Sequence, residues 1–415
     1  MRLTRSAYRR GRPRGVAATV VAVSALVLGL PLAGCGSRPA ASTRTPGTVT
    51  GAQAGTSAQP AASTEPKAPA GPPLGAGEVG TLAQVPWAEI GPGWALAEYT
   101  TGTSQVAGPV TLYLVDPHGG LYELYSWPAT AEPWVLMAWS GDETRALLEQ
   151  VGTSQPTLHQ LTIATGQVTT FTLPSAATQV LGYTRPDGEN ILVQQDGVVR
   201  YNLTGVFQAR LSDGPEDASV VSSPDGLTEV AGGSTGVDLV SNAGGVVRFL
   251  GIPGGPLVAG ACTPVRWWNA ADILVSCVPP GARGPQLWIV PVSGAIPTQL
   301  TPVRTDGPDF GDMDAWQLPT GLYLQAETGC GPPFIAEQLA GGTVQAVSGG
   351  SASLVVATSG DLMLVRQSGC VPGSSLAWFN PATGTRQPVL TALANSTGVI
   401  AAIPYNGDGE QPSAQ

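Results

Sequence analysis

The segment Val221-Ser-Ser-Pro-Asp-Gly226 precedes a strand-like run and recurs, with changes, along the chain. Tyr183-Thr-Arg-Pro-Asp-Gly188 is its clearest copy, whereas Trp139-Ser-Gly-Asp-Glu143 and Trp268-Asn-Ala-Ala-Asp272 are more degenerate. In such a turn an Asp side chain accepts backbone N–H groups, and the Gly that follows adopts a left-handed conformation. The turn aspartates are Asp142, Asp187, Asp225 and Asp272, with spacings of 45, 38 and 47 residues.

Short strands are predicted on both sides of these turns. Runs such as Leu121–Trp127, Ile273–Cys277 and Leu362–Val365 are rich in β-branched and aromatic residues and are bounded by turn formers. No amphipathic helix of twelve or more residues is visible. A period near 40 residues with four strands is typical of a propeller blade.

The fold predicted from these repeats is all-β, a β-propeller of four-stranded blades. Seven blades fit best, six or eight are alternatives, and a β-sandwich with similar turns is a further one. A last strand near Val399–Tyr405 is expected to pair into the first blade and close the ring. The expected units lie near 94–127, 137–173, 181–211, 219–251, 264–302, 314–347 and 352–391.

Composition agrees with this interpretation. The 415 residues include 55 Gly and 38 Pro, and only 12% are charged, which excludes a protein of long helices. The 42% of hydrophobic residues is enough to form a sizeable core.

The Ser-Pro-Asp-Gly-type turns resemble the WD40-like repeat of TolB-type β-propellers. Asp187 and Asp225 stand in the clearest copies, and the resemblance extends over most of residues 87–405. It implies a propeller that makes protein–protein contacts in the cell envelope. TolB differs in having a soluble form and an additional N-terminal domain, so participation in a Tol system does not follow.

The N-terminus has the features of an export signal. An Arg-rich segment at 1–15 precedes the apolar segment Val16–Leu30, and Leu32-Ala-Gly-Cys35 resembles the bacterial lipobox. The resemblance implies cleavage before Cys35, diacylation of Cys35 and a membrane anchor on the extracytoplasmic face. A plain secretory signal and an uncleaved helix are the alternatives.

The resulting division has four parts. Residues 1–34 form the signal peptide, and 35–85 form a disordered tether of Ala, Gly, Pro, Ser and Thr that begins with the lipidated Cys. Residues 86–406 form the propeller, and 407–415 form a disordered tail.

Charge excludes nucleic acid as a partner. Six Arg precede the apolar segment, so the formal net charge of −10 becomes −16 once they are removed. An acidic body without a basic stripe repels phosphates and an anionic membrane surface. Membrane attachment is therefore expected through the lipid alone.

Four further cysteines suggest two disulfides outside the reducing cytosol. We favour Cys262–Cys277 within one blade and Cys330–Cys370 between the last two blades. The other pairings and a Cys₄ zinc site remain alternatives, although no CxxC spacing supports zinc.

The strongest candidate for a ligand site is the acidic segment 306–314. Its four carboxylates, with glycines for sharp bends, could surround Ca²⁺, but a solvated acidic loop is the simpler interpretation. The residues are Asp306, Asp309, Asp312 and Asp314. We expect no other cofactor.

No catalytic constellation is visible. His118 is expected in an exposed turn and His159 on an exposed strand, and the Trp residues mostly fall at positions of core packing. The sequence therefore predicts a non-catalytic binding or scaffolding propeller with an envelope protein as partner. Alternatives are a hydrolase or lyase with facing carboxylates at the propeller mouth, and a glycan-binding module with exposed Trp.

Overall fold

A computed structural model describes residues 74–103, 106–129, 134–150, 153, 155–174, 177, 179–212, 219–253, 262–280, 282, 284–302, 309–328, 331–367, 373–394 and 396–405. Cys35, the tail and most of the predicted tether lie outside these residues. No α-helix occurs in the described part, whose one helical element is the short 3₁₀ turn η1 (Leu82–Gln84). Accordingly, no described helix has the length and apolarity to span a bilayer.

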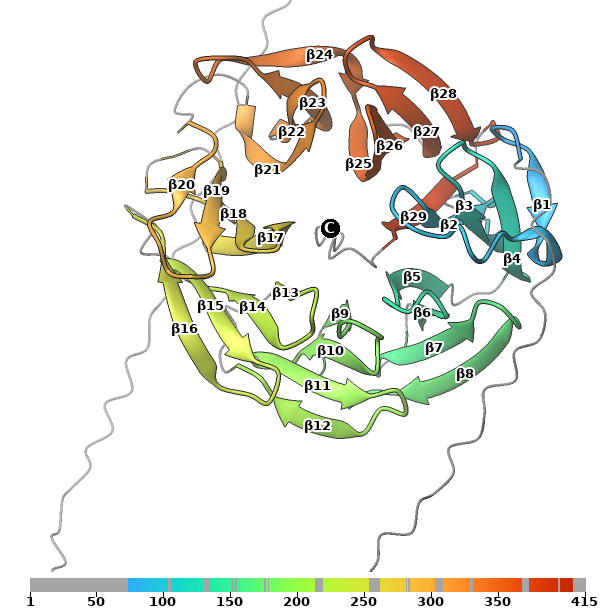
Figure 1. Ribbon diagram of the computed structural model, residues 1–415. Coiled ribbons are helices and arrows are strands. Elements are labelled where there is room, and N and C mark those ends of the chain that lie inside the picture. Colours follow the sequence, from blue (N-terminus) through green and yellow to red (C-terminus); the bar gives the residue numbers. More distant parts are fainter. Residues whose placement is uncertain are drawn as a thin grey trace, which may run out of the picture. The chain divides into compact units, whose positions relative to one another are not determined.

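Seven β-sheets stand around a common centre as the blades of a propeller (Figure 1), which confirms the predicted fold class and blade number. The innermost strand of each blade lies nearest the ring centre. Blade 2 comprises β5 (Trp134–Trp139), β6 (Arg145–Gln150), β7 (Thr157–Thr162) and β8 (Gln167–Thr172); blade 3 comprises β9 (Gln179–Tyr183), β10 (Asn190–Gln194), β11 (Val198–Asn202) and β12 (Phe207–Arg210). Blade 4 comprises β13 (Val220–Ser222), β14 (Thr228–Gly232), β15 (Gly236–Ser241) and β16 (Val246–Gly251); blade 5 comprises β17 (Cys262–Asn269), β18 (Asp272–Cys277), β19 (Gln286–Pro291) and β20 (Thr298–Gln299). Blade 6 comprises β21 (Asp309–Leu318), β22 (Gly321–Thr328), β23 (Gly331–Gln338) and β24 (Val344–Ser351); blade 7 comprises β25 (Ser353–Ser359), β26 (Leu362–Gln367), β27 (Ser375–Asn380) and β28 (Thr385–Leu390).

The first blade joins the two ends of the propeller. β29 (Gly398–Pro404) is its innermost strand and pairs antiparallel with β2 (Ala95–Thr100), from Ala95 opposite Pro404 to Thr100 opposite Gly398. β3 (Val110–Val115) and β4 (Leu121–Trp127) complete the four-stranded blade. The prediction that a last strand closes the ring is confirmed.

A fifth strand widens the first blade. β1 (Val79–Thr81) pairs in parallel with the outer strand β4, and η1 follows it directly. The predicted tether boundary at residue 85 is therefore wrong, because residues 79–84 already belong to the folded propeller. The Ala/Gly/Pro composition hid this segment, since only three residues make the strand.

The turns between the inner two strands share one hydrogen-bonding scheme in blades 2 and 4. In blade 4, Asp225 Oδ1 accepts from Ser223 Oγ (2.6 Å) and from the N–H of Leu227 (3.0 Å). In blade 2, Asp142 Oδ1 accepts from Ser140 Oγ (2.5 Å) and from the N–H of Thr144 (3.2 Å). The Asp side chains thus accept hydrogen bonds from donors in the turn that have no partner in the described neighbouring strands.

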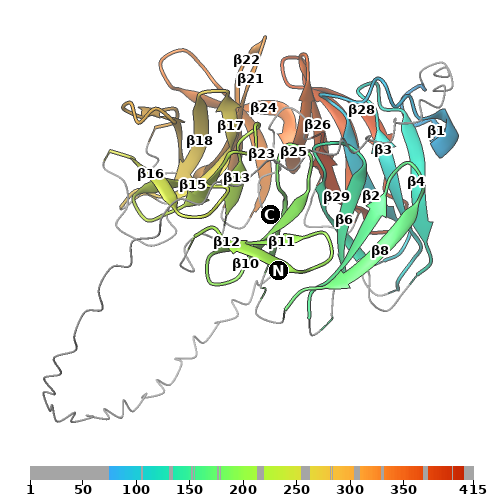
Figure 2. The same ribbon diagram turned by 60° about the horizontal axis from the view of Figure 1, so that its bottom comes forward.

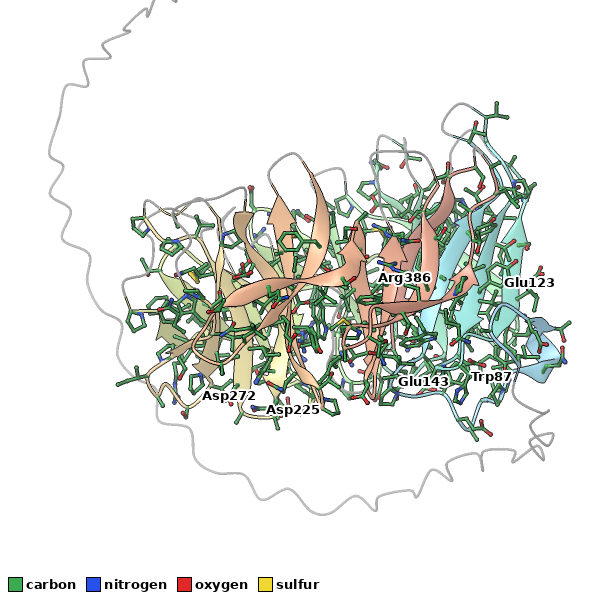
Figure 3. The ribbon with its side chains drawn as sticks, turned by 90° about the horizontal axis from the view of Figure 1, so that it is seen from above. Trp87, Glu123, Glu143, Asp225, Asp272 and Arg386 are labelled. Atoms are coloured by element: carbon green, nitrogen blue, oxygen red, sulfur yellow. A yellow bond between two sulfur atoms is a disulfide. The ribbon has the colours of Figure 1, made fainter. Side chains whose placement is uncertain are left out.

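The residue after the turn Asp is left-handed in three of the four copies, those of Asp142, Asp187 and Asp225. Gly226 has a φ of 68° and Gly188 a φ of 71°, whereas blade 2 places Glu143 in the same conformation with a φ of 63°. Glu143, Asp225 and Asp272 lie along the same face of the ring (Figure 3). The repeated motif therefore marks one face of the propeller.

The turns of Asp187 and Asp272 form their hydrogen bonds with different atoms. The carbonyl of Asp187 accepts from Arg145 Nη2 of the preceding blade (2.6 Å). In blade 5, Asn269 Oδ1 accepts the N–H groups of Ala271 (2.7 Å) and Asp272 (3.0 Å), so Asn269 performs the role predicted for Asp272. Asp272 instead accepts from Asn269 Nδ2.

Blades contact one another through apolar clusters crossed by a few polar side chains. Gln325 on β22 accepts from the N–H of Val355 (2.9 Å) and donates to the carbonyl of Ser353 (2.8 Å), which ties blade 6 to blade 7. Arg366 on β26 donates to the carbonyl of Ile400 (2.6 Å) and ties blade 7 to β29.

Glu98 on β2 makes the corresponding contact between blades 1 and 2. Its Oε2 accepts from the N–H of Leu136 at 2.7 Å. Leu136, Val355 and Ile400 are each the third residue of an inner strand. At the first two the N–H donates to a side chain, and at Ile400 the carbonyl accepts from one. A side chain from the second strand thus supplies the backbone of the next inner strand with a hydrogen bond.

Candidate functional site

The predicted acidic cation site is only partly described. Asp306 lies outside the described residues, as does the side chain of Asp309. The expectation of a solvated loop is wrong from Asp309 onward, because Asp309–Leu318 form strand β21. Within β21, Asp312 and Asp314 are buried.

Asp314 forms an ion pair instead of facing solvent. Its Oδ1 lies 3.1 Å from Arg266 Nε on β17 and also accepts from the N–H of Ala315. Burial raises the pKa of Asp314, and the Arg266 guanidinium opposes that rise. Arg266 lies over the rings of Trp268 (5.4 Å) and Trp316 (5.5 Å), so the pair joins blades 5 and 6 in an aromatic setting.

No described group of three or more His, Cys, Asp or Glu side chains is placed to hold a metal ion. Because two of the four acidic side chains are outside that search, Ca²⁺ binding stays a prediction.

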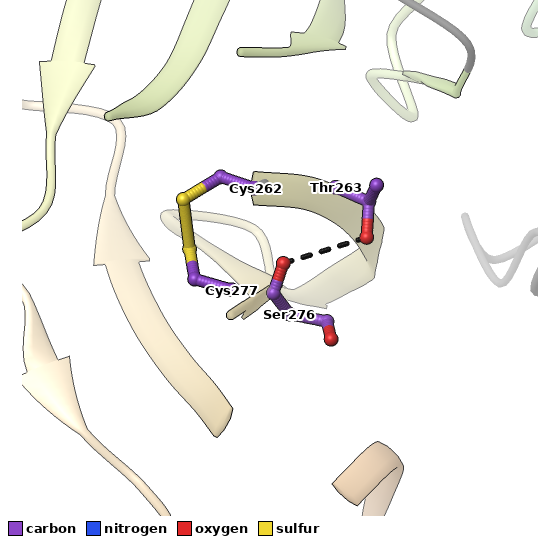
Figure 4. Close-up of a disulfide and its surroundings, with 4 residues drawn as sticks. All are labelled: Cys262, Thr263, Ser276 and Cys277. Carbon is purple, nitrogen blue, oxygen red and sulfur yellow. Dashed lines mark hydrogen bonds between the residues drawn. A yellow bond between two sulfur atoms is a disulfide. The ribbon is translucent and has the colours of Figure 1, made fainter. Parts of the chain in front are cut away.

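One predicted disulfide is confirmed. Cys262 and Cys277 are bonded, and they lie directly opposite each other at the ends of β17 and β18 (Figure 4). Beside them, Thr263 Oγ1 donates to the carbonyl of Ser276. Cys330 and Cys370 lie outside the described residues.

The two histidines differ in their surroundings. His118 is exposed in a turn, as expected. His159 is buried, so the prediction of an exposed sheet residue is wrong. It stacks on Trp134 with ring centroids 3.7 Å apart, and its Nδ1 lies 2.9 Å from Thr170 Oγ1. Burial lowers the pKa of His159, which favours the neutral ring.

The ring centre contains a cavity of about 280 Å³ bounded by five innermost strands, β5, β9, β13, β17 and β29 (Figure 1). Apolar residues dominate its wall, and its polar members carry no charge. The apolar ones include Val135, Met137, Leu181, Val265 and Ile400; the polar ones are Gln179, Tyr183 and Ser219. Burial raises the pKa of Tyr183, so its phenol stays neutral.

One buried carboxyl group, Glu98, lies behind this wall. Glu98 contacts the backbone of Leu136, a wall residue, and is fully buried. Burial raises the pKa of Glu98 to about 8, although the Leu136 N–H works in the opposite direction. Glu98 is therefore neutral near pH 7 and adds no charge to the cavity.

Sequence reasoning did not identify this cavity. The inner strands carried a sequence signal for it. Trp134–Trp139 and Gly398–Pro404 are apolar on both faces, whereas a half-exposed strand alternates apolar and polar residues. Consecutive residues of these strands, such as Val135–Trp139, border the cavity, so both faces of the strand are covered by protein.

The predicted core role of tryptophan agrees with the exposure of these residues. All ten Trp side chains belong to the described part, and each is buried or half-buried. An exposed row of indoles, which a glycan platform would need, is not formed by them.

Comparisons with known proteins add similarity of fold. No protein-family model matches the chain, and no curated protein matches its sequence. TolB from Acinetobacter baumannii is 12% identical with a TM-score of 0.43, over 75% of this chain and 66% of that chain. Oligogalacturonate lyase from Vibrio parahaemolyticus is 12% identical with a TM-score of 0.46, over 72% of this chain and 86% of that chain.

A puromycin-hydrolysing peptidase from Mycobacterium tuberculosis is 15% identical with a TM-score of 0.46, over 77% of this chain and 57% of that chain. The chain thus spans less than two thirds of the TolB and peptidase chains. At these identities the similarity concerns the fold, and by its own strand pairing the chain is a seven-bladed β-propeller.

Proposed function

We propose that this protein is a lipid-anchored binding module on the extracytoplasmic face of the cell membrane. Its propeller holds a partner protein of the envelope without catalysing a reaction on it. The lipobox-like Leu32–Cys35 supports the anchor, and the acidic composition of the body leaves the lipid as the means of attachment.

The apolar, uncharged wall of the central cavity is the main support for a binding role. General acid–base catalysis needs a titratable group within hydrogen-bond reach of the reacting atom. Among the described residues, those around this cavity include no Asp, Glu, His, Cys, Lys or Arg. An apolar wall with a few neutral polar groups suits an apolar side chain or a short extended segment.

A charge placed in the cavity wall tests this role. Met137 and Leu181 are half-buried wall residues, so Met137→Glu and Leu181→Glu should abolish crosslinking of the anchored protein to its partner. Val106→Glu is the matched control, because Val106 is 66% exposed and lies outside the wall. Circular dichroism identifies any variant that has unfolded, and Leu181→Ser then replaces it.

The result that would contradict this role is catalytic activity of the propeller. Similar folds occur in an oligogalacturonate lyase and a peptidase, so purified protein should be offered envelope polymers and peptides. Turnover of any of them that Met137→Glu abolishes would overturn the non-catalytic role.

The anchor is tested separately. Cys35→Ala should move the protein from the membrane fraction to the soluble fraction, because the acyl chains are lost. Unchanged membrane association of Cys35→Ala would contradict the lipid anchor and support an uncleaved helix.

A further inference from the structure

Exposed apolar side chains occur on the outer strands of blades 3 and 4 and in the adjoining loop before β20 of blade 5. We call this surface the blade 3–4 rim. It includes Val247 on β16, which is 62% exposed, Phe249 on β16, which is 52% exposed, and Ile296 before β20, which is 83% exposed. Its remaining apolar members are Val206, Phe207 and Val246.

The two outer strands meet at one point of the rim. The N–H of Gly245, which leads into β16, donates to the carbonyl of Leu211, which follows β12. The chain order and Figures 1 and 2 place β12 and β16 on the outside of neighbouring blades. The exposed apolar residues of β16 therefore begin where β12 ends, whereas Val206 and Phe207 lie at the other end of β12, where Gly205 approaches Thr172 of blade 2.

β16 has an open backbone edge. It is the last strand of its sheet and pairs only with β15 among the described strands. The N–H of Ile252 donates to the carbonyl of Thr235, and hydrogen-bonded pairs alternate along antiparallel strands. With Phe249 opposite Asp238 and Gly251 opposite Gly236, the N–H and C=O groups of Phe249 and Gly251 point away from β15.

The rim also holds two exposed positive charges. Of the Arg side chains in the described part, only Arg210 and Arg248 are exposed, and they lie on β12 and β16. Arg248 makes one hydrogen bond, from Nη1 to the carbonyl of Val292 (3.0 Å). A guanidinium has five N–H donors, so Arg248 can also pair with an acid.

An apolar hollow of about 260 Å³ adjoins the open edge. Phe249, Leu250 and Gly251 form one side of it, and Ile296 and Pro297 of blade 5 form the other. A side chain projecting from a segment paired with β16 would find apolar contacts there.

The protein already uses strand addition on its first blade, where β1 covers the outer strand β4. Two other outer edges are less suited: β20 has two residues, and β28 contains Pro388, which lacks an N–H. Native proteins normally protect long apolar edges, so an unprotected one marks an interaction site.

We propose that β16 binds an extended segment of a partner protein, in which acidic residues alternate with apolar β-branched residues. The segment adds as a fifth strand to blade 4, with an acidic residue beside Arg248 and apolar residues over Val247, Phe249 and the hollow. This site is separate from the central cavity, and its test does not depend on the role of that cavity.

Charge and backbone favour this occupant over two others. A second copy paired antiparallel about Arg248 would place like charges opposite each other, within a body that is already acidic. A membrane surface would offer no partners in register for the outward N–H and C=O groups of Phe249 and Gly251.

The probe is a capped synthetic peptide of alternating Val and Glu, with a Val/Lys peptide for comparison. The Val/Glu peptide should bind the full chain in fluorescence anisotropy and slow hydrogen exchange at the Phe249 and Gly251 amides. Arg248→Glu and Phe249→Lys should each weaken binding about tenfold or more, which is about 1.4 kcal/mol. Leu393→Lys is the matched control, since Leu393 is 57% exposed and lies far along the chain from the rim.

Three results would overturn the proposal. The first is equal binding of the two peptides, and the second is equal weakening by Phe249→Lys and Leu393→Lys. The third is binding of phosphatidylglycerol vesicles, or dimerisation seen by sedimentation, that depends on Phe249 while the Val/Glu peptide does not bind. Circular dichroism confirms that each variant is folded.

Discussion

At the scale of single residues, the blade junctions show why a buried carboxyl group can be tolerated. Glu98 and Gln325 both accept a backbone N–H from the next inner strand, one as a carboxyl group and the other as an amide. An amide is neutral at every pH, whereas burying a charged carboxylate is costly. The raised pKa of Glu98, about 8, resolves this conflict by keeping the group protonated.

The titration of Glu98 predicts a pH dependence of stability. Its pKa is about 8 in the folded protein and near the ordinary 4.5 when unfolded, so the folded state binds more protons between these values. Stability should therefore fall as pH rises from about 5 to 8, by up to ~1.4 kcal/mol per pH unit. Glu98→Gln should flatten this dependence and be more stable than the wild type at pH 8, measured by urea unfolding.

Glu123→Gln is the control, because Glu123 is exposed on the outer strand β4. Its curve should run parallel to that of the wild type. If Glu98→Gln also runs parallel to the wild type, Glu98 does not titrate in this range.

The turn glycines predict a second effect of one residue. A Cβ on Gly226 would lie 2.0 Å from the carbonyl oxygen of Arg185 in blade 3, whereas a Cβ on Gly360 would meet nothing within 4 Å. Both residues are left-handed, so Gly360→Ala should cost about 1 kcal/mol. Gly226→Ala should cost a further ~1–3 kcal/mol, because blade 3 must move. Equal losses in thermal unfolding would show that the blades separate without strain.

At the scale of elements, the inner strands are apolar, and the outer strand is more polar in blade 2 but not in blade 4, where β16 exposes Val246, Val247 and Phe249. β6 is buried at its centre, whereas β8 is exposed at most positions. The inner strands are buried because neighbouring blades cover them on both sides. Blade 5 differs from the other blades, because its outer strand β20 has only two residues and a disulfide joins its two inner strands.

Removing that disulfide should destabilise blade 5. The bond joins residues separated by 15 positions, for which the chain-entropy model gives about 3 kcal/mol. The double variant Cys262→Ala/Cys277→Ala should lower the free energy of unfolding by about this amount in urea. Cys330→Ala/Cys370→Ala, measured alongside, tests the second predicted bond, and an unchanged value for the first pair would contradict its stabilising role.

At the scale of the whole molecule, one strand closes the ring. β29 pairs with β2, takes a hydrogen bond from Arg366 of blade 7 and contributes Ile400 to the cavity wall. Closure leaves no inner strand without a neighbouring blade. The stability of the propeller should therefore depend on a segment of seven residues at the end of the fold.

Ending the chain after Thr397 should abolish cooperative thermal unfolding, because blade 1 loses its inner strand. A synthetic peptide of residues 396–405 added in trans should restore it, and a peptide with Ile403→Glu should not, since Ile403 is buried. A truncated chain that melts like the full chain would show that closure by β29 is dispensable.

The repeating turns and the strand periodicity were enough to predict the architecture. All seven expected units begin and end within about five residues of the observed blades, and closure and the Cys262–Cys277 bond were predicted as well. Glycine, aspartate and β-branched residues act through local backbone preferences, so their effect is legible in a single sequence.

The candidate site residues were harder to predict from the sequence. The segment around Asp312 and Asp314 contains turn formers and carboxylates, which favour a loop, yet β21 continues through it because Arg266 stands 3.1 Å from Asp314. His159 is buried because Trp134 covers it, although the two residues belong to different strands.

The sequence alone predicted the strands, the turn chemistry of blades 2 and 4, seven blades as the best fit and the resemblance of Cys35 to a lipidation site. Only the tertiary structure decided which carboxylates are buried, where the uncharged cavity lies and which outer edge is covered by a fifth strand. The first two depend on contacts between neighbouring blades, such as Glu98 with Leu136, 38 residues apart. Such contacts arise from the curvature of the closed ring, which no local pattern of residues encodes.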